Sequence, residues 1–134
     1  MVCIYCGAET SVINSRPQKR SNHIWRRRQC TDCTAVFTTS EAPDLSKCLV
    51  VVRGKALQPF SRDKLFLSVH SSLKHRKTAL TDASGLTDTI LSRLYPHIAS
   101  GTLPVLSIVA TTLKTLKHFD TASATHYEAF HPLV

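Results

Sequence analysis

Four of the five cysteines fall into two pairs with the same internal spacing. Two residues separate Cys3 from Cys6, and two separate Cys30 from Cys33. A Cys-x2-Cys pair turns the chain so that both sulfurs face one point, and two such pairs supply the four thiolates of a tetrahedral zinc site. Two disulfides, or reduced cysteines packed as small hydrophobic residues, are the alternatives. The pattern favours one structural Zn²⁺ ion.

The segment between the cysteine pairs is strongly basic. The whole chain has a formal net charge of +8, and no acidic residue occurs between positions 16 and 28. Such a stripe attracts phosphates, and the aromatic rings within it can pack on sugars or bases. A solvated basic face is the alternative. The candidate nucleic-acid-binding residues are Arg16, Lys19, Arg20, Trp25, Arg26, Arg27 and Arg28.

These residues must be positioned by a small β-sheet. Short strands are expected at residues 11–15, 23–29 and 35–39, with a polar loop at 15–22 that contains a proline. Side chains alternate between the faces of a strand, so Trp25 and Arg27 share one face while Arg26 and Arg28 share the other. Residues 1–41 are therefore predicted to form a three-stranded zinc ribbon, which is too short to fold without its metal.

The remainder of the chain is predicted to be a second domain at residues 48–134, joined by a linker at 42–47. A strand at 48–53, with Cys48 buried in it, leads through a turn into a short strand that ends at Phe60. Ser61 is a candidate N-cap for the first of several amphipathic helices. Later helices are expected at about 83–98, from 105 onward and around Tyr127. The fold class is α+β, with a small β-hairpin followed mainly by helices.

Several functional classes are not supported by the sequence. No run of about 18 apolar residues predicts a transmembrane helix, and the free thiols without an export signal indicate the reducing cytoplasm. We find no Ser-His-Asp arrangement, no paired carboxylates and no glycine-rich phosphate loop, so an enzyme is not expected.

Four motifs carry a resemblance to a known family. They are Cys3-x2-Cys6-Gly7, Val12-Ile13-Asn14-Ser15-Arg16, Trp25-Arg26-Arg27-Arg28-Gln29-Cys30 and Phe37-Thr38-Thr39-x-Glu41. In this order they resemble the NrdR family of transcriptional repressors of ribonucleotide reductase genes. The second half is similar to the ATP-cone of that family through Val50-Val51, Arg53, Pro59-Phe60, Ser61 and Lys64-Leu65.

The resemblance implies a cytoplasmic, nucleoid-associated repressor. Its zinc ribbon would bind double-stranded DNA at promoter sites, and its cone would bind ATP or dATP as effectors and set the state of a homo-oligomer. No membrane partner is expected. The nucleotide-binding residues implied are Val51, Arg53, Lys55, Gln58, Ser61 and Lys64.

The second half also departs from the family pattern. Val52 replaces a lysine, Gln58 a glutamate, Ser61 an Asp or Asn, and Val105 a serine. The alternative hypothesis is therefore a zinc-ribbon module for nucleic-acid or protein interaction whose degenerate cone binds no nucleotide.

Overall fold

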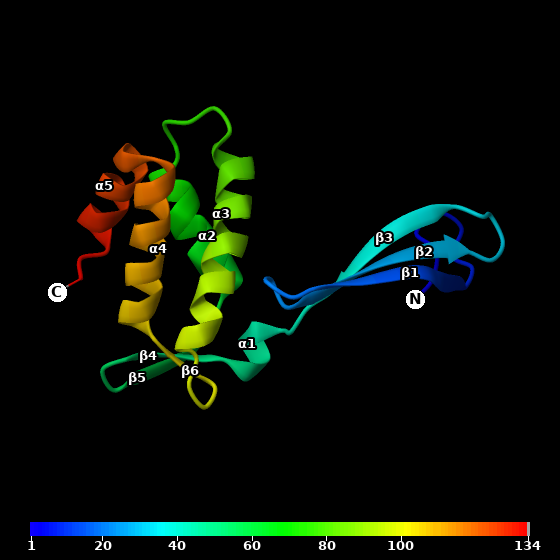
Figure 1. Cartoon of the computed structure of the whole chain (residues 1–134), viewed down its shortest axis with the longest axis horizontal. Helices are drawn as coiled ribbons and strands as arrows, with labels where there is room; N and C mark the ends of the chain where they lie inside the picture. Colours follow the sequence, from blue (N-terminus) through cyan, green and yellow to red (C-terminus); the bar gives the residue numbers. More distant parts are fainter. Residues whose placement is uncertain (134) are drawn as a thin grey trace. The chain divides into compact units, whose positions relative to one another are not determined.

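The computed structural model describes residues 1–133 and divides the chain into two compact units. The first unit, Met1–Pro43, is the blue and cyan part of the ribbon in Figure 1. The second unit begins at Asp44 and contains every helix of the described chain. Each unit has its own packing and is described by itself.

The first unit is an antiparallel sheet with the strand order β1-β2-β3. Its strands are β1 (Thr10–Gln18), β2 (His23–Cys30) and β3 (Val36–Glu41). The expected loop at 15–22 is too long, because β1 continues through Pro17 to Gln18. Proline cannot donate to the neighbouring strand, but β1 is an edge strand, where this loss is tolerated. Only residues 19–22 form the turn, and Asn22 takes a positive φ of 49° there.

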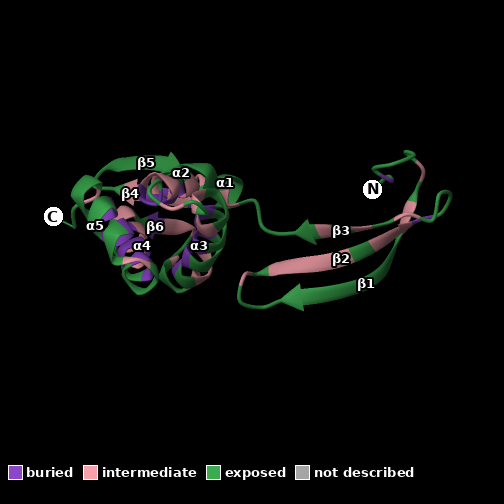
Figure 2. Ribbon diagram, turned by 90° about the horizontal axis from the view of Figure 1, so that it is seen from above, coloured by how far each residue is buried: buried purple, intermediate pink, exposed green. Residues whose placement is uncertain are grey.

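The ribbon has almost no hydrophobic core. Among its residues only Cys3 and Cys30 are buried, while β1 is exposed from Ser11 onward. Figure 2 shows this unit in green and pink, with buried positions confined to the cysteine end of the sheet. A unit of this size that buries so little apolar surface needs a metal or disulfide to hold its fold.

The second unit starts with a short helix and a small sheet. Helix α1 (Leu45–Cys48) forms where the sequence predicted the end of a linker, because Asp44 caps it by accepting a hydrogen bond from the Ser46 backbone at 3.1 Å. The prediction that Cys48 is a buried strand residue was therefore wrong: Cys48 ends α1 and is exposed. Leu49 is the buried residue instead.

The sheet of this unit has the order β5-β4-β6. Strands β4 (Val50–Arg53) and β5 (Ala56–Pro59) form the expected hairpin, turning at Gly54 with a φ of 58°. Strand β6 (Thr102–Pro104) pairs parallel to β4 and was not predicted from the sequence. The central strand β4 carries Val51 into the core.

Four helices pack beside this sheet (Figure 1). They are α2 (Arg62–Ser72), α3 (Ala79–Leu94), α4 (Val105–Phe119) and α5 (Thr121–Phe130), with a 3-10 turn η1 (Tyr95–His97) after α3. Their apolar faces meet in one core that includes Val69, Ile90, Leu103 and Leu116, all fully buried. No helix within residues 1–133 has the length and apolarity needed to cross a membrane.

Candidate metal centre and nucleic-acid interface

The four paired cysteines come together in space. All four sulfurs lie within 4.8 Å of one another. The Sγ atoms of Cys3 and Cys33 are 3.7 Å apart, and those of Cys6 and Cys30 are 3.4 Å apart. A tetrahedral Zn²⁺ with Zn–S bonds of about 2.3 Å requires sulfurs separated by roughly 3.8 Å. The donor set and its dimensions therefore fit one structural zinc ion.

Backbone groups in each cysteine turn support this fit. The backbone N–H of Tyr5 donates to the sulfur of Cys3, and that of Asp32 donates to the sulfur of Cys30, both at 3.4 Å. The Asp32 hydrogen bond is the main cause that lowers the pKa of Cys30 to about 7. Amide donors of this kind stabilise thiolates, which are the form that binds metal.

The Cys33 sulfur shows why a cation is needed. The backbone N–H of Ala35 acts to lower its pKa, but partial desolvation and the neighbouring sulfurs of Cys6, Cys30 and Cys3 raise it to about 12. Four thiolates this close repel one another, and a bound divalent ion compensates their charge.

The two cysteine turns differ in backbone strain. Gly7 follows the first pair with a φ of 79°, and Thr34 follows the second with a φ of 60°. Glycine adopts this left-handed region freely, whereas a β-branched residue is strained in it. The second turn tolerates this strain, and the Thr34 hydroxyl donates to the Cys33 carbonyl at 2.7 Å.

One face of the ribbon combines two arginines with the tryptophan. In the β1–β2 register Arg16 lies opposite Trp25, and Asn14 lies opposite Arg27. Opposite residues in an antiparallel pair share a face, so Arg16 lies on the same face as Trp25 and Arg27. The alternation along the strand predicted the common face of Trp25 and Arg27, whereas Arg16 was expected in the loop. Arg16 and Arg27 are exposed and Trp25 is half-buried.

On the other face of the ribbon, the arginine side chains bind to residues of the ribbon itself. Nη2 of Arg26 lies 3.1 Å from Oε2 of Glu41, and Nη1 of Arg28 donates to Oγ1 of Thr10 at 3.4 Å. Both arginines are half-buried. The partners Glu41 and Thr10 were not assigned this role from the sequence, because the signal lies in a strand register that only the folded sheet defines. Lys19 and Arg20 lie apart from both sets, in the turn between β1 and β2.

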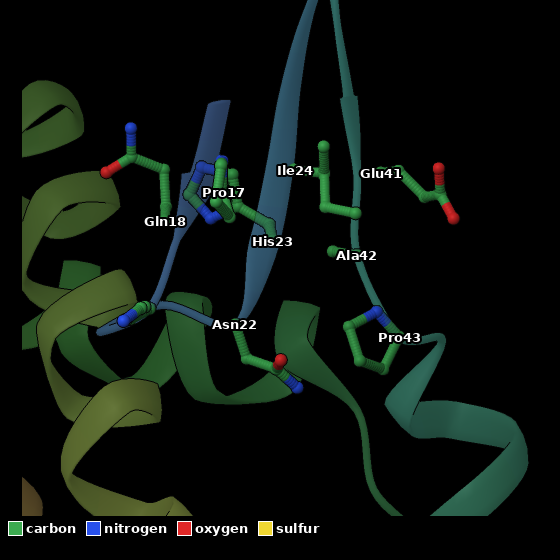
Figure 3. A pocket seen from close by; sticks show the side chains of 9 residues that line it. Pro17, Gln18, Asn22, His23, Ile24, Glu41, Ala42 and Pro43 are labelled. Carbon is green, nitrogen blue, oxygen red and sulfur yellow. The ribbon is translucent and has the colours of Figure 1, made fainter. Parts of the chain in front are cut away.

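A hollow of about 500 Å³ lies at the end of the ribbon that carries this turn. Figure 3 shows the side chains around it, with His23 and Asn22 beside the turn and Glu41 on the third strand. The hydroxyl of Ser21 is 2.6 Å from Nδ1 of His23 and fixes the imidazole ring. The lining residues are Pro17, Gln18, Lys19, Asn22, His23, Ile24, Glu41, Ala42 and Pro43.

The candidate nucleotide-binding residues gather around β4, β5 and the start of α2. Val51 lies opposite Gln58 in the hairpin, although the Val51 side chain is buried in the core. Ser61 caps α2 by accepting a hydrogen bond from the Lys64 backbone at 3.2 Å, as predicted. Arg53 ends β4 and Lys55 occupies the turn, both exposed.

One neighbour of this set was missed by the sequence analysis. Burial lowers the pKa of His131, and the positive charge of Arg53 lowers it further. The His131 ring also stacks on Tyr127, with ring centroids 4.4 Å apart. The charge of Arg53 at the end of β4 therefore acts on the residue that follows α5, which no local pattern indicates.

Known proteins share both halves of this chain. A sequence model described as "Transcriptional repressor NrdR-like, N-terminal domain" matches residues 1–41. A protein named transcriptional repressor NrdR from Sphingopyxis alaskensis is 36% identical over 90% of this chain and 77% of its own length. A repressor of the same name from Caulobacter vibrioides is 31% identical over 98% of this chain and 83% of its own. The chain belongs to the NrdR family of transcriptional repressors.

Membership in the NrdR family confirms three expectations from the sequence. It accounts for the zinc-binding ribbon at the N-terminus, on which the family model and the cysteine geometry agree. It confirms the α+β organisation of a ribbon followed by a helical, cone-like unit. It also places the chain among regulators rather than enzymes, because the relatives are named repressors.

Proposed function

We propose that this NrdR-family chain is a zinc-dependent, nucleotide-responsive repressor that binds double-stranded DNA at promoters of ribonucleotide reductase genes. The observation that carries the proposal is the ribbon face formed by Arg16, Trp25 and Arg27. Two exposed guanidinium groups flank an indole ring there, and no described carboxylate pairs with them. Arginine can bind phosphate, or O6 and N7 of guanine, in a two-pronged geometry.

Zinc would act through the shape of the ribbon and not through direct contact with DNA. Bound zinc supplies a rigid crosslink between the two cysteine turns. The strands that begin and end at these turns then hold Arg16 opposite Trp25. Removal of the metal would release the strands, because the ribbon has no core of its own.

A single ribbon offers a small surface for DNA. Specific DNA-binding modules bury about 600–1,000 Å² even when they are single, and a three-residue face is smaller than that. Linking two or more ribbons in a homo-oligomer would raise the effective affinity without a new contact. Oligomerisation is then the step at which an effector controls binding.

The second unit would bind ATP or dATP at the start of α2 and the β4–β5 hairpin. The helix N-terminus favours an anionic phosphate, and Lys64 stands in its first turn. Arg53 and Lys55 add positive charge at the hairpin turn. Lys55 would take over from the lysine that Val52 replaces. Such a regulator works beside the chromosome in the cytoplasm.

The test measures DNA binding and size together on the zinc-loaded full chain. Fluorescence anisotropy follows a labelled promoter duplex with no nucleotide, with ATP and with dATP, while light scattering reports the oligomer. The proposal expects one nucleotide to change both duplex affinity and oligomer size. Duplex binding without any nucleotide effect would instead support the ribbon module with a degenerate cone. No duplex binding at low salt would refute the proposal.

A further inference from the structure

A second basic cluster lies on the helical unit. A hollow of about 490 Å³ is formed by the end of α3, the turn η1 and one face of α4. None of its lining residues is acidic. They are Arg93, Pro96, His97, Thr111, Lys114 and His118. The set shares no residue with the ribbon or with the proposed nucleotide site.

Helical spacing explains how α4 contributes to this hollow. Thr111, Lys114 and His118 are three and four residues apart, so they lie on one side of the helix. The opposite side of α4 carries Leu113 and Leu116 into the core. The core therefore fixes the rotation of α4 and with it the basic side that faces away from the core.

Arg93 is held in place by a chain of hydrogen bonds. Its Nη1 donates to Oγ1 of Thr115 at 3.0 Å, and that hydroxyl donates to the Thr111 carbonyl at 2.8 Å. Thr115 is only 4% exposed, so the anchor is rigid. One of the five guanidinium N–H donors is used in this way, and the others stay available for a ligand.

The positive charge of the cluster is not neutralised within the described chain. The ion-paired carboxylates of this unit are Asp82, Asp88 and Asp120, and their partners are Arg62, His75 and Arg76. None of them pairs with a residue of the hollow. A concave site lined by one sign of charge concentrates ions of the opposite sign.

Helix dipoles account for only part of this arrangement. Arg93, His97 and His118 lie in the last turns of α3, η1 and α4, where cations are favoured. Lys114 lies earlier in α4 and has no such reason to be basic. The dipole effect also does not explain why the basic C-terminal ends of α3, η1 and α4 line the same hollow.

We propose that this hollow binds a phosphate-bearing polyanion, whose contacting phosphate groups together carry at least two negative charges. Arg93 and Lys114 would supply charge, while the Thr111 hydroxyl and the imidazoles would supply hydrogen bonds. No aromatic ring other than these imidazoles lines the hollow, so recognition would depend on charge rather than on base stacking. The phosphate could belong to a free polyphosphate or to a nucleic-acid backbone, which present the same chemistry.

The test uses inorganic tripolyphosphate as the probe and the zinc-loaded full chain. Calorimetry would show binding to the unmodified protein, and NMR would show amide shifts at residues 93–95, 97 and 111–118. Lys114→Gln should weaken binding about fivefold, the effect of one solvent-screened charge. Lys117→Gln removes the same charge from the same helix outside the hollow and should change affinity much less.

Two results would overturn the phosphate site. The first is the absence of tripolyphosphate binding, or amide shifts confined to residues outside the hollow. The second is an equal loss of tripolyphosphate affinity in Lys114→Gln and Lys117→Gln, which would indicate only general attraction to a basic protein. The NMR measurement on the unmodified chain decides the question even where a variant fails to fold. Because the amide shifts report the hollow separately from the ribbon, loss of DNA binding in a ribbon variant would not be confused with failure of this site.

A parallel titration distinguishes the two sources of the phosphate. If the natural ligand is a nucleic-acid backbone, Lys114→Gln should also reduce the salt dependence of binding to a short mixed-sequence duplex. If it is a free polyphosphate, duplex binding should stay unchanged while tripolyphosphate binding weakens. Either result supports the phosphate site and identifies what occupies it.

Discussion

Arg16 on β1 lies directly opposite Trp25 on β2, and this pair shares its face with Arg27. The neighbouring Arg28 lies on the other face and donates to Thr10. Two adjacent arginines of the same charge therefore have different surroundings. This contrast allows the proposed DNA-binding face to be tested with one matched pair of variants.

Arg27→Gln should weaken duplex binding. The slope of log affinity against log salt concentration should become shallower by about one, as expected for a lost phosphate contact. Arg28→Gln removes the same charge but should affect the slope less, because that side chain is half-buried and bonded within the ribbon. A salt titration of duplex affinity checks both variants. Equal slopes for Arg27→Gln and the unmodified protein would exclude Arg27 from phosphate contact.

Cys30→Ser should reduce the metal content well below one zinc ion per chain and unfold the ribbon, because three thiolates leave the metal under-ligated. The helical unit should keep its structure, since its core draws only on residues from Leu45 onward. Metal analysis and far-ultraviolet circular dichroism report these two effects separately. Cys48→Ser is the control, because Cys48 is exposed and lies outside the cysteine cluster. Full zinc content in Cys30→Ser would contradict the four-thiolate site.

Lys64→Ala should lower dATP affinity by about 1–3 kcal/mol, the range for losing a charge-assisted hydrogen bond. The helix should remain intact, because its cap uses the Lys64 backbone and the Ser61 side chain. Lys77→Ala is the control, since this exposed lysine lies in the turn between α2 and α3. Calorimetry that finds the same affinity in both variants would remove Lys64 from the nucleotide site.

Local patterns in the sequence predicted those features that depend on neighbouring residues. The spacing of Cys3 and Cys6 defines a metal-binding turn without reference to the rest of the fold. Ser61 is recognisable as a cap because its partner, the Lys64 backbone, is only three residues away. The alternation of Trp25 and Arg27 likewise predicted their common face, because the period of a strand is two.

Features that depend on distant partners were not predicted. Strand β6 has only three residues and forms by parallel pairing with β4, about fifty residues earlier in the chain. The apolar run that begins at Cys48 indicated a strand, but the Asp44 cap extends a helix through Cys48 first. The ion pair of Arg26 with Glu41 requires the β2–β3 register. In each case the deciding contact is tertiary.

Asp120 links the segment after α2 to the start of α5, and its own backbone forms the C-cap of α4. It caps α5 by accepting hydrogen bonds from the Ala122 backbone at 3.1 Å and the Ser123 hydroxyl at 2.8 Å. Its Oδ2 also lies 2.7 Å from Nε2 of His75 and 3.6 Å from Nη1 of Arg76, both from the segment after α2. The Ser123 hydroxyl, followed by His75, lowers the pKa of Asp120 from 3.8 to about 2.

This lowered pKa predicts how stability depends on acid. The folded state favours the ionised carboxylate, so the contribution is complete above about pH 4 and is lost as the pH falls towards 2. Asp120→Asn keeps a capping side chain but removes the charge. It should lower the melting temperature at pH 6 by about 4–8 °C, with the difference from the unmodified protein disappearing near pH 2. Asp88→Asn, which breaks an exposed pair with Arg62, should cause a much smaller change. Melting curves followed by helix ellipticity measure all three proteins, and a pH-independent difference for Asp120→Asn would show that its charge is not what stabilises the junction of α4 and α5.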